Sequence, residues 1–548
     1  MAVAFLPQVA RAAGDVVINA KNFPDENFRN YLFEQDYGED GKLTEDEIKN
    51  ITTLNVEYRE IGSLQGIEYF VALVELYCSY NQLTVLNISK NIALTWLECR
   101  GNNLTSLDVS GNTKLTTLDC WSNQLTTLDV SKNIALTKLD CSSNQLTALD
   151  VSKNILLETL YCDHNQLTAL DVSKNIALIE LECRDNPLII LDASRCTALT
   201  ILQVNGIQLT TLDVSWCTAL TKLDCNSNQL TTLDVSGCIA LTELDCSSNH
   251  LTALDVSKNT ALAYLSCAYN QLTALDVSKN IALAVLFCQG NQLMSLDISK
   301  NTALWWVDCY NNQLKVLDVS KNIALGFLDC CNNQLTTLDV PKKSVLLRLN
   351  CYNNQLTTLD VSGCTSLWDL RCNNNQLTAL HVSNALEVLY CHDNQLTTLD
   401  VSDNAVLQHL FCSYNQLTTI NISGCTSLNL LYCYSNQIKG ISMDNLIKSL
   451  PIRWGCEFRV YSLLSSDEKN VCTKEQVKAA KEKGWIALYE YAPDWWQEYE
   501  GSDDTPSVID DIRTESSKNA PVYNLRGQRL AAPQKGINII SGRKVFVK

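Results

Sequence analysis

A unit of 21 residues repeats along most of the chain, and this repeat constrains the fold more than any other feature. Residues 136–156 read LTKLDCSSNQLTALDVSKNIL, and a closely similar segment follows at once. The clearest marker is a cysteine with an asparagine three residues later, as in Cys141 and Asn144. A fixed period of this length predicts a solenoid, because each unit buries its apolar edge only against its neighbours.

The spacing LxxLxCxxNxL resembles the signature of leucine-rich repeat proteins, in the short form found in bacteria. The motif recurs about eighteen times, and about 370 of the 548 residues carry it. Each unit has two apolar edges, one with Leu139 and Cys141 and one with Leu149 and Val151, separated by turns. We therefore expect a leucine-rich repeat solenoid over residues 51–440, mainly β with little helix.

The segments before the repeats predict a leader and a small cap. Residues 1–14 contain Ala10, Arg11 and Ala12, a small-x-small pattern like a signal-peptidase site, which we interpret as the remnant of a secretory signal. A disordered leader is the alternative. Residues 15–50 predict a helical cap, because Phe23 and Tyr31 are spaced as one face of a helix.

The stretch DYGEDGKLTEDE, residues 36–47, resembles an EF-hand calcium loop. Gly38 stands where a further oxygen ligand is expected, so the resemblance implies weak and structural calcium binding. The alternative is an Asp-Gly turn between two cap helices, with the acids solvated. The sequence implies no other cofactor. The candidate calcium ligands are Asp36, Asp40, Lys42 through its carbonyl, and Glu47.

The segments after the repeats predict an α+β cap over residues 441–501. Two helices are expected, at MDNLIKSL and at TKEQVKAAKEKG, where Thr473 and Gln476 fit a capping box. Strands are expected around Pro493, and residues 502–520 read as a polar linker. The stretch 521–548 is basic, and its sequence predicts a small β segment. It resembles the C-terminal sorting segments of proteins that Bacteroidetes-type bacteria export. A terminal β-element without a transport role is the alternative.

The placement of the 25 cysteines argues against a disulfide scaffold. Most lie in the repeat column of Cys141, where they are expected to point inward as small buried hydrophobes. A second group occupies a column that elsewhere holds asparagine, and we expect these to cap backbone groups at a turn. Free thiols are therefore expected, with Cys456 and Cys472 as the one candidate bridge. The second group is Cys196, Cys217, Cys238, Cys364 and Cys425.

Charge and composition narrow the classes of function. The net charge is -18, which argues against nucleic-acid binding, and no apolar run is long enough to span a bilayer. The sequence shows no group of residues with the spacing of a known catalytic motif, so we expect that the protein is not an enzyme. Acids recur just before the column cysteine, as at Asp119 and Asp140, where neighbouring charges repel. A solvated face is favoured there over a site for cations or a basic partner.

Aromatic residues recur at outward positions of the expected sheet, mostly in its second half. Strand propensity alone could place them there, but an exposed aromatic patch more often marks a binding site. We interpret the chain as a monomeric, secreted or cell-surface protein that recognises an extracellular protein in adhesion or host contact. A carbohydrate-binding accessory protein and a structural spacer are the alternatives. The candidate ligand-binding residues are Tyr264, Tyr269, Phe287, Trp306, Tyr310, Phe327, Tyr352, Tyr390, Phe411, Tyr414, Tyr432 and Tyr434.

Overall fold

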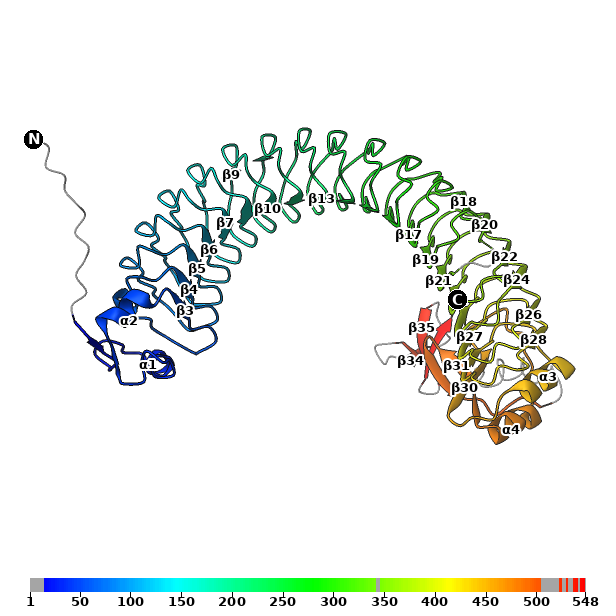
Figure 1. Cartoon of the computed structure of the whole chain (residues 1–548). Helices are drawn as coiled ribbons and strands as arrows, with labels where there is room; N and C mark the ends of the chain where they lie inside the picture. Colours follow the sequence, from blue (N-terminus) through cyan, green and yellow to red (C-terminus); the bar gives the residue numbers. More distant parts are fainter. Residues whose placement is uncertain are drawn as a thin grey trace, which may run out of the picture. The chain divides into compact units, whose positions relative to one another are not determined.

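The computed structural model describes residues 14–341 and 345–503, together with four strands between Val522 and Val547. The chain divides into two compact units, Met1–Ala282 and Leu283–Lys548. Each unit holds a stack of repeat coils, which Figure 1 shows as successive loops of the chain. Nearly all of the proposed secretory remnant and of the polar linker lies outside the described residues.

The first unit is built on a parallel sheet to which each coil adds one three-residue strand. Adjacent strands pair in register, so that Leu118 lies opposite Leu139. On the far side of the coils, β9 (Leu170–Asp171) pairs with β11 (Leu191–Asp192). The strands of the main sheet are β3 (Thr53–Asn55), β4 (Glu75–Tyr77), β5 (Trp96–Glu98), β6 (Thr117–Asp119), β7 (Lys138–Asp140), β8 (Thr159–Tyr161), β10 (Glu180–Glu182), β12 (Ile201–Gln203), β13 (Lys222–Asp224), β14 (Glu243–Asp245) and β15 (Tyr264–Ser266).

A small cap precedes these coils, as the helical pattern predicts. Asp25 caps α1 by accepting from the backbone nitrogen of Phe28, and Thr44 and Glu47 form a capping box on α2. Phe23 is fully buried, against the rings of Phe28 and Phe70. The elements are β1 (Val16–Val17), α1 (Glu26–Phe33), β2 (Lys42–Leu43), α2 (Glu45–Asn50) and the short 3-10 helix η1 (Ile67–Tyr69).

The second unit repeats the same plan. Its main sheet is parallel through β31, and a second set of short parallel strand pairs forms on the far side of the coils. The main strands are β16 (Val285–Phe287), β17 (Trp306–Asp308), β19 (Phe327–Asp329), β21 (Arg348–Asn350), β23 (Asp369–Arg371), β25 (Val388–Tyr390), β27 (His409–Phe411) and β29 (Leu430–Tyr432). The far-side strands are β18 (Val316–Asp318), β20 (Thr337–Asp339), β22 (Thr358–Asp360), β24 (Ala379–His381), β26 (Thr398–Asp400) and β28 (Thr419–Asn421).

An α+β cap closes the second unit. Its strand β30 (Cys456–Ser462) pairs with β29 and continues the repeat sheet, and β31 (Trp485–Ala492) and β32 (Trp495–Glu498) follow as a hairpin. The helices are α3 (Ile441–Ser449) and α4 (Lys474–Glu482), and the expected capping box of Thr473 and Gln476 is present. The four terminal strands are β33 (Val522–Asn524), β34 (Arg529–Leu530), β35 (Gly536–Ile540) and β36 (Arg543–Val547).

Stacked asparagines hold successive coils together. The Asn144 Nδ2 donates to the carbonyls of Cys120 and Cys141, each at 3.1 Å, and its Oδ1 accepts from the backbone nitrogen of Leu125 at 2.9 Å. The tight turn would otherwise leave these backbone groups unpaired and buried. Ile207 takes this position in one coil and has neither a side-chain acceptor nor a donor, so the ladder is interrupted there.

All 25 cysteines are free and buried. In the second column, the Cys196 Sγ lies 3.7 Å from the carbonyls of Val172 and Asn175. Asn154 makes the equivalent contacts to the preceding coil, donating to the carbonyls of Val130 and Asn133. Cysteine therefore replaces asparagine as the group that caps this turn. Cys456 and Cys472, the one candidate bridge, are not bonded.

Candidate binding surface

The three-residue strands determine which side chains face away from the core. In nearly every coil the middle residue is fully buried, while the first and third are partly accessible. In β27, for example, Leu410 is buried between the outward residues His409 and Phe411. Because adjacent strands pair in register, the same position in successive coils forms a continuous outward column.

In the second unit, five partly accessible rings form what we call the aromatic cluster: Tyr390, Phe411, Tyr432, Tyr434 and Trp496. The rings of Tyr390 and Phe411 stack with centroids 4.4 Å apart, and Phe411 meets the ring of Tyr432 edge-on at 4.7 Å. Trp496 of the cap hairpin lies 5.0 Å from Tyr434 and 6.3 Å from Tyr432. The cap thus extends a surface that begins on the repeats.

Two arginines lie over these rings. The guanidinium carbon of Arg459 lies 4.0 Å from the ring centroid of Tyr432 and 4.4 Å from that of Trp496. Arg371 lies over Tyr390 at 5.2 Å. A cation over an aromatic face is attracted by the ring quadrupole, so these contacts fix the arginines on the surface. Sequence reasoning missed both arginines and Trp496, because each takes its role from residues distant in sequence.

A second set of rings, the Trp306 group, comprises Phe287, Trp305, Trp306 and Phe327. Trp306 lies 5.5 Å from Phe287 and 5.1 Å from Phe327, and its Nε1 donates to Asp308 at 2.9 Å. Gly326 makes room for Trp305, since an added Cβ there would lie 2.5 Å from the indole ring. Trp305 and Trp306 are each about 40% exposed, which leaves their rings available for contact.

The twelve candidate ligand-binding residues occupy two kinds of position. Seven of them lie on strands of the main sheets, and the other five lie in the turn that follows. Tyr269 and Tyr414 hold left-handed backbone conformations there, with φ of +52° and +50°. The seven on strands are Tyr264, Phe287, Trp306, Phe327, Tyr390, Phe411 and Tyr432, and the five in turns are Tyr269, Tyr310, Tyr352, Tyr414 and Tyr434.

The acidic column runs along the main sheets of both units, with Asp119 and Asp140 in the first and Asp308 and Asp329 in the second. Burial, followed by the neighbouring charge of Asp140, raises the pKa of Asp119 to about 6. Arg100 relieves part of this repulsion, with its Nε 3.5 Å from the Asp119 carboxylate. Arg184 pairs in the same way with Glu182 of the column at 2.6 Å, and also with the nearby Asp163 at 2.9 Å. A carboxyl group whose pKa is raised by folding opposes folding when it is ionised, so ionised Asp119 is unfavourable to the fold.

The side chains of the predicted calcium loop form hydrogen bonds and an ion pair within the cap. The Glu47 Oε2 accepts from the backbone nitrogen and the hydroxyl of Thr44, each at 2.7 Å. Asp40 accepts from the backbone nitrogen of Lys42 at 3.1 Å, and the Lys42 Nζ lies 2.6 Å from Asp15. Within the described ranges, no group of three or more acidic, histidine or cysteine side chains is arranged to hold a metal.

Two glycines shape this loop. Gly41 has a φ of +82°, which fits the sharp turn of the resemblance. At Gly38 an added Cβ would lie 1.9 Å from the carbonyl oxygen of Leu32, so an acidic ligand cannot replace this glycine without moving the backbone. Calcium binding by the loop remains a prediction. A rise in melting temperature on adding calcium would support it, and an unchanged melting temperature would contradict it.

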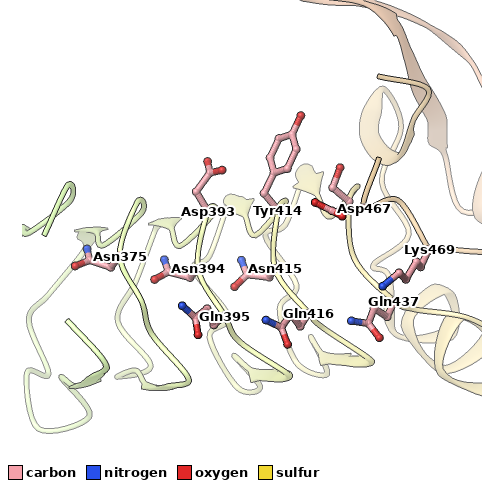
Figure 2. A pocket seen from close by; sticks show the side chains of 11 residues that line it. Asn375, Asp393, Asn394, Gln395, Tyr414, Asn415, Gln416, Gln437, Asp467 and Lys469 are labelled. Atoms are coloured by element: carbon pink, nitrogen blue, oxygen red, sulfur yellow. The ribbon is translucent and has the colours of Figure 1, made fainter. Parts of the chain in front are cut away.

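A polar groove is lined by residues of the turns in successive coils (Figure 2). Tyr414 in its lining meets Tyr434 of the aromatic cluster at 5.3 Å. The groove is lined by side chains of successive coils, among them Gln416 and Tyr414, and by Asp467 and Lys469 of the cap. Sequence reasoning missed this groove, because the glutamine column looks the same in every coil. The cap residues that close the groove lie outside the repeat pattern.

The described part of the chain contains no helix with the length and apolar character needed to cross a membrane. Among solved structures, the chain is similar to the functional domain of InlJ from Listeria monocytogenes, which includes a cysteine ladder. The two are 37% identical over 65% of this chain and 79% of that domain, with a TM-score of 0.61. The chain belongs to the leucine-rich repeat family.

Two further leucine-rich repeat structures share the fold at lower identity. YopM from Yersinia enterocolitica is 23% identical, with a TM-score of 0.59 over 72% of this chain and 89% of that one. The Leptospira interrogans leucine-rich repeat protein LIC12759 is also 23% identical, with a TM-score of 0.50 over 74% and 95%. No protein-family model and no curated protein matches the chain.

Proposed function

We propose that this leucine-rich repeat chain binds another protein through the aromatic cluster of its second unit. The observation that carries the proposal is the gathering of five rings and two arginines at one end of the repeat sheet. Tyrosine, tryptophan and arginine are enriched at protein interfaces and supply much of their binding energy. Their mutual contacts hold the side chains in place before binding, so little side-chain entropy is lost when a partner docks.

We propose that the Trp306 group is a further part of the protein-binding surface. Its two exposed indoles present large apolar areas, and Tyr310 follows β17 in the same coil. Such anchors act by filling pockets on a partner. A double variant, Trp306→Ala with Tyr310→Ala, is therefore expected to weaken partner binding. Unchanged affinity would confine the binding surface to the aromatic cluster.

We propose a binding role rather than catalysis, at the outer cell surface or after secretion, in adhesion or host contact. The aromatic cluster offers rings and guanidinium groups, which suit recognition more than bond breaking. The support for export is the resemblance of residues 1–14 to a cleaved secretory signal and of residues 521–548 to a sorting segment. Detection of the protein only inside the cell by fractionation would contradict export.

Single substitutions in the aromatic cluster test the proposed function. A partner is first captured from extracellular fluid on the immobilised full chain and identified, and its dissociation constant is then measured by surface plasmon resonance. Phe411→Ala removes the ring that contacts both Tyr390 and Tyr432, and it should raise the Kd at least about tenfold, or about 1.4 kcal/mol.

The matched control is Trp216→Ala in the first unit, because Trp216 is 67% exposed and belongs to neither aromatic set. It should leave the Kd within about twofold, since isolated exposed rings contribute little to binding. Equal affinity of wild type and Phe411→Ala would contradict the proposed site. Equal loss in both variants would indicate non-specific apolar adsorption.

A further inference from the structure

The polar groove has a volume of about 540 Å3, within the range of about 300–1,000 Å3 usual for small-ligand sites. Every residue that lines it carries a polar side chain. Figure 2 shows one glutamine from each of three successive coils, Gln395, Gln416 and Gln437, arranged in a row beside the ladder asparagines. Successive rows are spaced by the distance between paired strands, about 4.8 Å.

The asparagines and glutamines of the groove differ in whether their amides are already used. The Asn394 Nδ2 donates to the Cys372 carbonyl at 3.0 Å, and its Oδ1 accepts from Leu377 at 2.9 Å, so its amide belongs to the fold. In the part of the chain that the structure describes, the side-chain amides of Gln395, Gln416 and Gln437 make no hydrogen bond. These glutamines therefore retain a donor and an acceptor for a ligand.

The cap supplies the end wall of the groove. Asp467 and Lys469 are exposed and line it, while Glu468 between them turns inward. The Glu468 Oε2 accepts from the backbone nitrogens of Ser435 at 2.7 Å and Ser462 at 2.9 Å. This carboxylate fixes the segment against the last coil, so the wall is held in place without a ligand.

Tyr414 occupies a backbone conformation that does not suit it. Its φ is +50°, and the equivalent position of other coils mostly holds serine, asparagine, aspartate or glycine, which tolerate left-handed backbone better. Strain of this kind persists where the side chain serves a function. The ring is 38% exposed, and it meets Tyr434 edge-on at 5.3 Å, which sets its orientation beside the groove.

We propose that this groove binds a neutral oligosaccharide, as a second site beyond the protein-binding surface. Planar amides in a row can each bond a pair of neighbouring hydroxyls, and their spacing is close to the length of one sugar ring in a chain. The Tyr414 ring packs on the apolar face of a sugar. Two carboxylates, Asp393 and Asp467, outnumber the one ammonium of Lys469, so an acidic sugar is disfavoured.

An extended peptide fits the groove less well, because the backbone groups at its edge are already paired. The backbone nitrogen of Gln416 donates to the Leu396 carbonyl at 2.9 Å, and that of Tyr414 donates to the Tyr434 carbonyl at 3.1 Å. A peptide that adds to a sheet needs such groups unpaired. The groove also lacks the apolar pockets that would hold peptide side chains.

The test is a calorimetric titration of the full chain with cellotriose, maltotriose and tri-N-acetylchitotriose, and with trigalacturonate as an anionic control. At least one neutral trisaccharide should bind with a Kd near or below about 1 mM, and trigalacturonate should bind at least about tenfold more weakly. Gln416→Ala should raise the Kd at least about tenfold. Gln145→Ala, at the same repeat position in the first unit, should leave it unchanged.

Tyr414→Asn separates a functional from a structural role of the ring. It should abolish saccharide binding yet raise the melting temperature by about 2 °C, because asparagine tolerates the left-handed backbone. The proposal would be overturned if no neutral trisaccharide bound, if Gln416→Ala bound as wild type, or if Tyr414→Asn kept full affinity. These titrations need no protein partner, so their outcome is independent of the proposed protein-binding surface.

If the groove instead holds a segment of the protein partner, Gln416→Ala will weaken capture of that protein while no trisaccharide binds. That result would overturn the saccharide proposal and make the groove a part of the protein-binding surface.

Discussion

The side-chain oxygen of Asn470 accepts a hydrogen bond from the backbone nitrogen of Ile438 at 2.8 Å. Its Nδ2 donates to the carbonyls of Cys433 at 2.8 Å and Val460 at 2.9 Å. In the preceding coil, Asn436 bonds the backbone nitrogen of Leu417 in the same way, at 2.9 Å. A residue of the cap thus supplies the last member of the asparagine ladder.

Asn470→Ala should destabilise the second unit by about 2–4 kcal/mol, because three buried backbone groups lose their partner. Urea unfolding followed by circular dichroism measures the change. Asn384→Ala is the control, since Asn384 is exposed and should change stability by less than about 0.5 kcal/mol. A similar small effect of both variants would show that the last ladder position does not hold the cap.

Burial raises the pKa of Glu468 to about 7, above the ordinary glutamate value of about 4.5. Between about pH 4.5 and 7, Glu468 is largely protonated in the folded state and largely ionised in the unfolded state. The free energy of unfolding should therefore fall as the pH rises through this window. The expected loss is up to about 3 kcal/mol. Glu468→Gln should flatten the profile, and an unchanged slope would contradict this assignment.

The acidic column predicts a substitution that stabilises the protein. Because the pKa of Asp119 is raised to about 6, its ionised form opposes folding at pH 7, and Asp119→Asn should add about 1–2 kcal/mol there. At pH 5 the gain should be about half as large, because the proton difference between the folded and unfolded states spans about pH 3.8 to 6. Asp129→Asn is the control: the hydroxyl and backbone nitrogen of Ser131 lower the pKa of Asp129, so its replacement should not stabilise. Equal gains from both variants would indicate general charge reduction.

The cysteine columns predict unreactive thiols in the folded protein. Burial raises the pKa of Cys99 and its neighbours well above the usual range, and the thiolate is the reactive form. The native protein should react with less than about one equivalent of iodoacetamide. In the protein unfolded by guanidinium chloride, all 25 cysteines should react. Labelling of several thiols in native protein would contradict burial of the columns. Mass spectrometry gives both counts.

The repeats and helix caps could be predicted from the sequence because the residues that determine them lie close together in the chain. The 21-residue period fixes which leucines and cysteines point inward, and Thr473 lies only three residues from Gln476, with which it forms the capping box. The position of Tyr414 in a left-handed turn could have been predicted from the sequence. The residue before the ladder asparagine is most often serine, asparagine, aspartate or glycine, a composition typical of left-handed turns.

The cap contacts and the groove could not be predicted in this way. Asn470 lies 34 residues beyond Asn436, outside the repeat spacing, so nothing local marks it as a ladder residue. Arg459 joins the aromatic cluster only because β30 pairs with β29, and Trp496 joins it through the hairpin of β31 and β32. Such contacts depend on how the cap folds back on the last coil.

Protein capture before and after removal of glycans tests the central claim most directly. The full chain is immobilised, and a mucosal extract is applied with and without prior enzymatic deglycosylation. We predict that a protein is retained in both arms and that Phe411→Ala fails to retain it. Capture lost with the glycans would favour carbohydrate recognition by the aromatic rings, and no capture in either arm would favour the structural spacer; both results would contradict protein recognition.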